Sequence, residues 1–415
     1  MKNAKRNINL WIILTAVVSV VLLAVLTWGN LRFARENPGG NDFLVHWVGT
    51  RALIMEGLNP YSDEVAARIQ TIAYGRLARP GEHELRVAYP LYSIVVFSPF
   101  ALVPDFDIAR AAWMTVLEVS LAVMTLLSLR LTRWRVGPIL IALLLLFSLF
   151  WYHGLRPLIN GNAVILVGLV LVAGLLALRA GADELAGVLF AFSTIKPQVV
   201  VLVLAFIAFW AINNRRWRVL AWMIGTVFLL SASTALLIPD WIVHNLREVL
   251  RYPAYNPPGS PQAAFRDWWP AWGNRVGWAL TGLVGSLLLI EWWNNRHASF
   301  RGLLWTFCLT LAIGQWSGIQ TDPGNFVVLV PAIILVFSLL DDRWRTGGRV
   351  FVLASLLLLF IGIWAIFLNT VEFANQPIQS PVMFFPLPAY LLITLYWVRW
   401  WAVQPPAVWI DMVNQ

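Results

Sequence analysis

Residues 8–28 read INLWIILTAVVSVVLLAVLTW and follow a short tail that contains Lys2, Lys5 and Arg6. A helix needs roughly 20 predominantly apolar residues to cross the hydrocarbon core of a bilayer. The apolar part of a cleaved secretory signal is shorter, about 7–15 residues. We therefore expect residues 8–28 to form a first membrane span that is retained.

The rest of the chain has the same apolar character, because 59% of its 415 residues are hydrophobic and only 12% are charged. In a soluble domain about a quarter of the residues are charged, and a soluble core could not hide so much apolar surface. The composition predicts an integral membrane protein rather than a soluble enzyme or a nucleic-acid-binding module. The single cysteine, Cys308, leaves no disulfide framework and no cysteine-based metal site.

Apolar runs bounded by charge, proline or glycine suggest about twelve transmembrane segments. Two short runs, 184–195 and 197–212, are separated only by Lys196-Pro197 and could form one kinked helix. Joining them would place the arginines of 215–218 outside, against the positive-inside rule. We therefore predict an all-α polytopic membrane protein, with residues 1–415 as one transmembrane domain and both termini cytoplasmic. The segments are 8–29, 107–130, 136–153, 161–179, 184–195, 197–212, 219–238, 275–292, 302–318, 326–340, 350–369 and 386–403.

The first predicted outer loop, residues 31–106, is long for a connection and should contain structure of its own. Asn41-Asp42 can cap a surface helix from Phe43 to Glu56. Ser62 can open a second helix, whose first acids suit the positive end of the helix dipole. The apolar stretch that ends at Pro104 is expected to be re-entrant or packed at the outer interface. A full crossing would place the arginines of 130–135 on the outer side, against the positive-inside rule.

Asp42 and His46 are the first candidate site residues, because a spacing of four places them on one face of a helix. A carboxylate beside an imidazole at the membrane surface can act as a general base on a hydroxyl group. The competing interpretation is that Asp42 only caps its helix. Spacing alone leaves both interpretations open.

Lys196 and Arg156 are candidates for binding a phosphate on the outer side. Apart from Lys196, the only lysines are in the N-terminal tail, and an ammonium group at membrane depth is costly unless it is paired. Arg156 precedes Asn160-Gly161-Asn162, and arginine suits bidentate contact with an oxyanion. The alternatives are that Lys196 extends to the headgroups and that Arg156 anchors the interface.

Two acidic features have simpler explanations that we favour. Asp105-Phe106-Asp107 has the Asp-x-Asp pattern of metal–nucleotide sites, but its place before a span favours helix capping. Glu118 lies inside a predicted span, where it could relay protons or bond to a neighbouring helix. The sequence contains neither a Walker loop, a His-Glu-x-x-His zinc motif nor a Gly-x-Ser-x-Gly elbow.

Several short motifs, in this order and spacing, resemble glycosyltransferase family 87. The resemblance extends over residues 8 to 340. The motifs are Asn41-Asp42 after the first span, Gly57-Leu58-Asn59-Pro60-Tyr61, Tyr89-Pro90 with Pro99 and Pro104, Gly161-Asn162, Gly187, and Ile195-Lys196-Pro197.

The resemblance implies a GT-C-type fold and transfer of a sugar, mannose by resemblance, from a polyprenyl-phosphate donor on the outer face. It implies that Asp42 is the essential aspartate and that Lys196 contacts the donor phosphate. His46, Arg156 and Asn162 complete the expected substrate-binding residues. No cofactor is expected, and a metal is not demanded, although a divalent ion is left open.

The chain departs from the family pattern at two places. It has Gly161-Asn162 where relatives usually show Gly-Gln, and Asn325-Phe326 where they often carry His-Tyr. The second departure bears on the acceptor side. If that departure removes activity, a scaffold in envelope synthesis is one alternative function. The main alternative is a transporter or lipid flippase, which the twelve segments, the broken helix at Lys196-Pro197 and Glu118 favour.

The expected partners are the polyprenyl-phosphate sugar, a lipid or glycan acceptor, and membrane lipids, without nucleic acid. A second predicted outer loop, residues 239–274, is rich in tryptophan and tyrosine, which settle in the headgroup layer. It could help to shape a groove open to lipid. The inside-positive tail suits the plasma membrane of a prokaryote, with the active site on the extracytoplasmic side.

Overall fold

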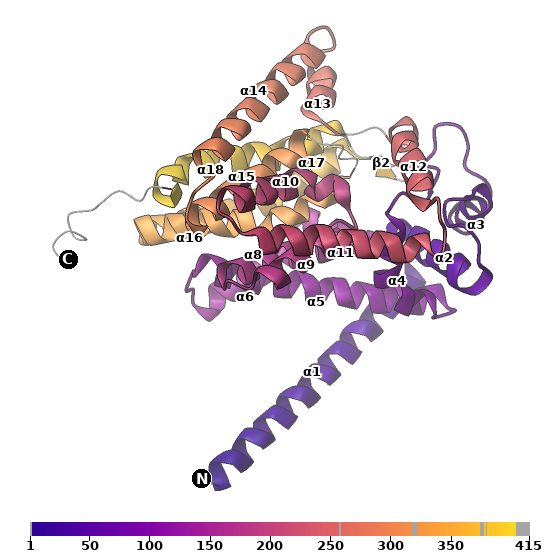
Figure 1. The fold of residues 1–415 in the computed structure, drawn as a ribbon, viewed down its shortest axis with the longest axis horizontal. Helices are drawn as coiled ribbons and strands as arrows, with labels where there is room; N and C mark the ends of the chain where they lie inside the picture. Colours follow the sequence, from indigo (N-terminus) through magenta and orange to yellow (C-terminus); the bar gives the residue numbers. More distant parts are fainter. Residues whose placement is uncertain (1, 257–258, 318–321, 374–376, 379, 404–415) are drawn as a thin grey trace, which may run out of the picture. The chain divides into compact units, whose positions relative to one another are not determined.

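The computed structural model describes residues 2–256, 259–317, 322–373, 377–378 and 380–403 (Figure 1). Its described part is almost entirely helical; the exception is a pair of two-residue antiparallel strands, β1 (Glu372–Phe373) and β2 (Pro377–Ile378). The chain divides into two compact units, which are described separately below. Unit 1 comprises residues 1–87, 93–119 and 158–162, and unit 2 comprises residues 88–92, 120–157 and 163–415.

Unit 1 is built around the first predicted outer loop and the two long apolar helices that flank it. α2 packs against both α3 and α4. Phe43 of α2 lies in a cluster of rings, with Phe106 and Trp113 stacked on it at centroid distances of 5.8 Å. The helices are α1 (Lys2–Glu36), α2 (Asn41–Glu56), α3 (Asp63–Tyr74), α4 (Ile94–Ala101) and the first part of α5 (Phe106–Thr132).

Unit 2 contains most of the apolar helices. α9 packs between α8 and α11, and α15 packs on α10 and α18, as Figure 1 also shows. α16 is buried along its apolar length and is the core of this unit. The helices wholly inside it are α6 (Pro138–Phe150), α8 (Val164–Arg179), α9 (Asp183–Ser193), α10 (Pro197–Asn213), α11 (Trp217–Ala235), α12 (Trp241–Tyr255), α13 (Pro261–Trp268), α14 (Gly273–Asn294), α15 (Phe300–Ser317), η2 (Pro323–Leu329), α16 (Val330–Trp344), α17 (Thr346–Thr370), η3 (Pro381–Phe384) and α18 (Pro386–Val403). Residues of both units occur in η1 (Leu91–Ser93), α5 and α7 (Tyr152–Asn160).

A helix occurs at each of the twelve predicted segments, but not all of these helices are long enough to span. Within the described residues, seven are long and apolar enough to cross a membrane, or eight if α6 and α7, bent by 52° at their junction, count as one. α8 and α10 are among the shorter apolar helices. Several apolar helices indicate a multi-pass membrane protein, and the count of twelve spans stays a prediction. The runs 184–195 and 197–212 form two separate helices, α9 and α10.

The first predicted outer loop contains the two helices that were predicted for it, with one error at the start of α2. Ser62 caps α3 by accepting a hydrogen bond from the Val65 amide. α2, however, begins at Asn41 and its N-cap is Gly40, which provides no side chain. The prediction that Asp42 caps this helix is therefore wrong, because the helix begins two residues before the predicted start at Phe43. The apolar stretch before Pro104 forms η1 and the short α4, which is too short to cross a bilayer.

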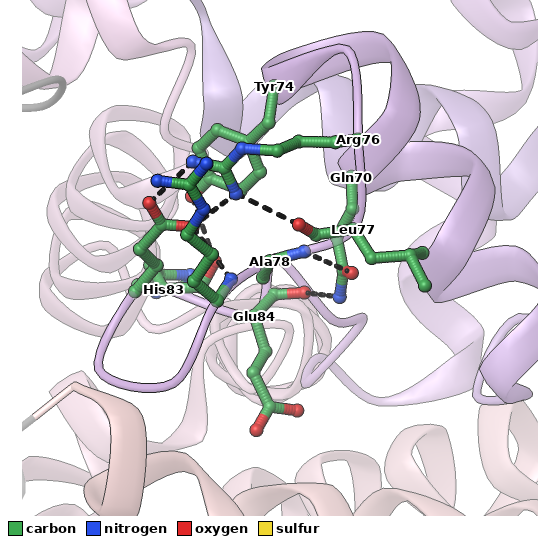
Figure 2. Close-up of polar contacts among 9 residues, drawn as sticks. Gln70, Tyr74, Arg76, Leu77, Ala78, His83 and Glu84 are labelled. Atoms are coloured by element: carbon green, nitrogen blue, oxygen red, sulfur yellow. Dashed lines mark hydrogen bonds and ion pairs between the residues drawn. The ribbon is translucent and has the colours of Figure 1, made fainter.

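Hydrogen bonds between side chains and backbone hold the segment after α3 in place (Figure 2). The Arg76 guanidinium donates to both carboxylate oxygens of Glu82 at 2.7 Å, and this contact lowers the pKa of Glu82 to about 2. Gln70 donates to the Glu84 carbonyl and accepts from the Ala78 amide. Gly81-Glu82-His83-Glu84 is thus an ordered loop and not a helical metal motif.

Gly161 provides a stability test, because its backbone is in the left-handed region and its Cα faces Phe43. Its φ is +72°, and a Cβ there would lie 2.5 Å from the Cβ of Phe43. Gly57 has nearly the same φ, +71°, but a Cβ there would have nothing within 4 Å. Gly161→Ala is expected to lower the free energy of unfolding by about 3 kcal/mol, against about 1 kcal/mol for Gly57→Ala. Thermal unfolding in detergent micelles measures the difference, and equal losses would contradict the packing argument.

Candidate functional site

Two of the predicted site residues, Asp42 and Asn162, are in direct contact in unit 1. The Asn162 Nδ2 donates to Asp42 Oδ2 at 2.8 Å, and the Asn162 side chain is buried. Asp42 lies in the first turn of α2, where the exposed amides of a helix favour a carboxylate. Since Gly40 is the cap, the Asp42 carboxylate is not engaged as the N-cap of α2. An amide from a segment 120 residues away orients it instead.

The backbone that presents Asn162 is held by the ring cluster. The Trp113 indole donates to the Gly161 carbonyl at 2.8 Å. Gly161 packs against Phe43, which is next to Asp42 in α2. This close approach leaves no room for a side chain at position 161. Glycine there allows the segment that ends in Asn162 to pack directly on α2.

His46 lies one turn beyond Asp42 on α2, as predicted, but packs into the interior of unit 1. Its ring stacks on Phe97 of α4 at a centroid distance of 4.2 Å and an interplanar angle of 5°. Only 5% of its surface is exposed. The geometry shows that His46 joins α2 to α4, and a role in substrate binding stays a prediction.

Lys196 and Arg156 share one carboxylate in unit 2. Lys196 stands at the break between α9 and α10, is 3% exposed, and places its ammonium 5.6 Å from the Tyr89 ring centroid. The Arg156 Nε donates to Asp322 Oδ1 at 3.1 Å. Burial alone would raise the pKa of Asp322, but Arg156, the Gly324 amide and Lys196 outweigh burial and hold that pKa below its usual range. Asp322 is therefore ionised at neutral pH, and the cluster brings two cations to one carboxylate.

The sequence analysis missed Asp322 as the partner of this cluster. It lies in a short connection, and Asp322-Pro323-Gly324 is typical of a turn. The structure shows that turn, with the Gly324 amide donating to Asp322 Oδ1 at 2.7 Å. The Arg156 pairing crosses 166 positions, and no local pattern signals such a distant contact.

His153 is a second residue that the sequence did not single out, and it fixes the same turn to α7. It is fully buried, and its Nδ1 lies 2.7 Å from the Pro323 carbonyl oxygen. Because a carbonyl can only accept, Nδ1 carries the proton, which leaves Nε2 as an acceptor. Among the described residues, Nε2 has no hydrogen-bond partner.

Asp105 and Glu118 make the structural contacts that the sequence analysis favoured for them. Asp105 caps α5 by accepting from the Ile108 amide at 2.9 Å. Glu118 accepts from the Asn30 side chain of α1 at 2.9 Å, so it bonds to a neighbouring helix. In the part of the chain that the structure describes, no three His, Cys, Asp or Glu side chains gather in a way that could hold a metal ion.

Removal of the Asp322 charge tests the importance of the shared carboxylate. Asp322→Asn is expected to lower the free energy of unfolding by about 3 kcal/mol, because it leaves Arg156 and Lys196 without their common counter-ion in a largely buried place. The control is Glu36→Gln, which breaks the exposed Arg32–Glu36 pair and should cost below about 0.5 kcal/mol. Thermal unfolding of both variants in the same detergent measures this, and a small loss for Asp322→Asn would show that the cluster is not stabilising.

A comparison with protein families gives one match. The sequence model of glycosyltransferase family 87 matches residues 88–314, which is over half of the chain. No curated protein and no solved structure matches this chain. The matched region contains Arg156, Asn162 and Lys196, whereas Asp42 precedes it and Asp322 follows it. The chain belongs to glycosyltransferase family 87.

Proposed function

We propose that this membrane glycosyltransferase moves a hexose, with mannose as the expected sugar, from a polyprenyl-phosphate donor to a hydroxyl of a lipid or glycan acceptor. The transfer inverts the anomeric centre, and Asp42 is the general base. The contact between Asn162 and Asp42 carries the proposal, because it orients a carboxylate that does not cap its helix.

The proposed reaction is a single displacement. The acceptor oxygen forms a bond to the anomeric carbon while the bond from that carbon to the phosphate oxygen breaks. The electron pair of that bond leaves with the polyprenyl phosphate, and the proton of the acceptor hydroxyl passes to Asp42. A correctly oriented base contributes about 10²–10⁴-fold to such a step. The Asn162 amide supports this role because it fixes one carboxylate oxygen of Asp42.

The cluster of Lys196, Arg156 and Asp322 suits the donor phosphate. A polyprenyl phosphate gains negative charge as it leaves, and fixed cations stabilise that charge most strongly where water is excluded. Lys196 is 3% exposed and therefore largely shielded from water. The presence of two cations in the cluster supports binding of an anion there.

The proposed location is the plasma membrane of a prokaryote, with both termini cytoplasmic and the site on the extracytoplasmic side. The distribution of arginines in the sequence supports this orientation. The proposal uses no cofactor and assigns no step to a metal ion.

Asp42→Asn tests the role of the base. With protein purified in native lipid extract and labelled polyprenyl-phosphate-mannose, this variant is expected to lose about 10²–10⁴-fold in transfer to lipid. Glu118→Gln is the control, because a glutamine oxygen can still accept from Asn30 and activity should stay within about twofold. Full transfer by Asp42→Asn would contradict the proposal. Absence of transfer by the parent protein, with this and other polyprenyl-phosphate sugars, would point to the transporter alternative.

Lys196→Met tests the phosphate role separately. The variant is expected to lower kcat/KM for the donor at least about tenfold, since a hydrogen bond to a charged group is worth about 1.5–3 kcal/mol. Arg218→Met is the matched control, because Arg218 is 77% exposed in its pair with Glu184. Initial rates over a range of donor concentration measure both variants. Equal donor kcat/KM values for Lys196→Met and the parent protein would remove Lys196 from the donor site.

A further inference from the structure

Arg110 is the most deeply buried arginine of unit 1, and the proposed reaction does not use it. It lies on α5, three residues before Trp113, and is 1% exposed. Its Nη1 donates to the Asn37 carbonyl at 2.8 Å and its Nη2 to the Ile159 carbonyl at 3.3 Å. Both acceptors are neutral, although a buried guanidinium is most strongly stabilised by a carboxylate.

The two acceptors flank the proposed site. Asn37 lies five residues before Asp42, and Ile159 lies three residues before Asn162. One guanidinium is therefore bonded to both segments that end in the Asn162–Asp42 contact. Trp113, on the next turn of α5, adds the bond to the Gly161 carbonyl.

The sequence before α2 is adapted to this side chain. Gly40 has a φ of +78°, and a Cβ there would lie 2.5 Å from the Arg110 Nε. A Cβ at Gly39 would lie 3.7 Å from the Arg110 Nη2. The Gly39-Gly40 pair thus lets the backbone pass directly over the guanidinium. Among the described residues, the Nε itself has no hydrogen-bond partner.

We propose that Arg110 is a positioning residue for the transfer reaction. It holds the segment before α2 and the end of α7 in the register that places the Asn162 amide on the Asp42 carboxylate. A lysine has one donor group at a single point, whereas the planar fork of an arginine can reach two carbonyls in fixed directions. The inference rests on the proposed role of Asp42.

The first experiment separates positioning from binding. Arg110→Met keeps the apolar stem and removes both bonds, so kcat is expected to fall about 10–100-fold while the donor KM stays within about twofold, since a small misplacement of a catalytic group can cost about 10²-fold. Arg110→Lys should recover part of the rate. Arg51→Met is the matched control, because Arg51 also donates to a carbonyl in unit 1, that of Ala101 at 3.0 Å. A kcat for Arg110→Met equal to that of Arg51→Met would overturn the proposal.

The second experiment asks whether Arg110 acts through Asn162. In an Asn162→Ala background, Arg110→Met should cost less than about threefold in kcat, because the contact that it positions is already absent. The proposal would be overturned if the loss in kcat of the double variant equals the product of the losses of the two single variants. If Arg110→Met does not fold, Arg110→Lys is combined with Asn162→Ala in its place. Its cost in kcat in that background is expected to stay below about threefold as well. Activity in Asp42→Asn would refute the proposed function, whereas an inactive Asp42→Asn with a fully active Arg110 variant would refute only this inference.

Discussion

The close packing of Gly161 against Phe43 is the constraint on which the proposed catalytic pair depends. Because Gly161 has no side chain and a positive φ, its backbone approaches α2 directly, and the next residue reaches Asp42. Interiors are packed so tightly that an added methyl group must displace a neighbour. Here the neighbour belongs to a cluster of stacked rings with little freedom to move. The geometry of the Asp42 carboxylate is therefore set by packing as much as by its hydrogen bond.

Electrostatic balance is the corresponding constraint in unit 2. Lys196 and Arg156 are held near one carboxylate, which reduces the free-energy cost of keeping two cations away from water. The carboxylate belongs to a tight turn whose own amide also donates to it. The cluster thus combines a stabilising ion pair with two cations that are proposed to bind an anion. That combination follows from the distant pairing of Arg156 with Asp322.

Local features of the site were predictable from sequence, whereas its long-range pairings were not. The Ser62 cap of α3 and the Asp105 cap of α5 follow from short-range rules and are confirmed. The Asp42 cap followed from the same rules and is wrong, because Gly40 begins the helix instead. Asp322 was missed since its partner lies 166 positions away, and a single sequence holds no record of such contacts. Asp42 and Lys196 are thus candidates that position and residue type alone suggested, whereas their surroundings required the structure.

Two buried side chains, Arg110 and His153, hold the loops that contain Asp42 and Asp322 through hydrogen bonds to backbone carbonyls. Arg110 on α5 donates to the Asn37 carbonyl before Asp42, and His153 on α7 donates to the Pro323 carbonyl after Asp322. Each donor is fully or almost fully buried, and a hydrogen bond is electrostatically stronger in a medium of low dielectric constant than in water. The carboxylates of the same two loops have partners of their own, the Asn162 amide for Asp42 and the Arg156 guanidinium for Asp322. Each loop is therefore held at two points, through a backbone carbonyl and through its acidic side chain, and together these bonds fix the direction of the carboxylate.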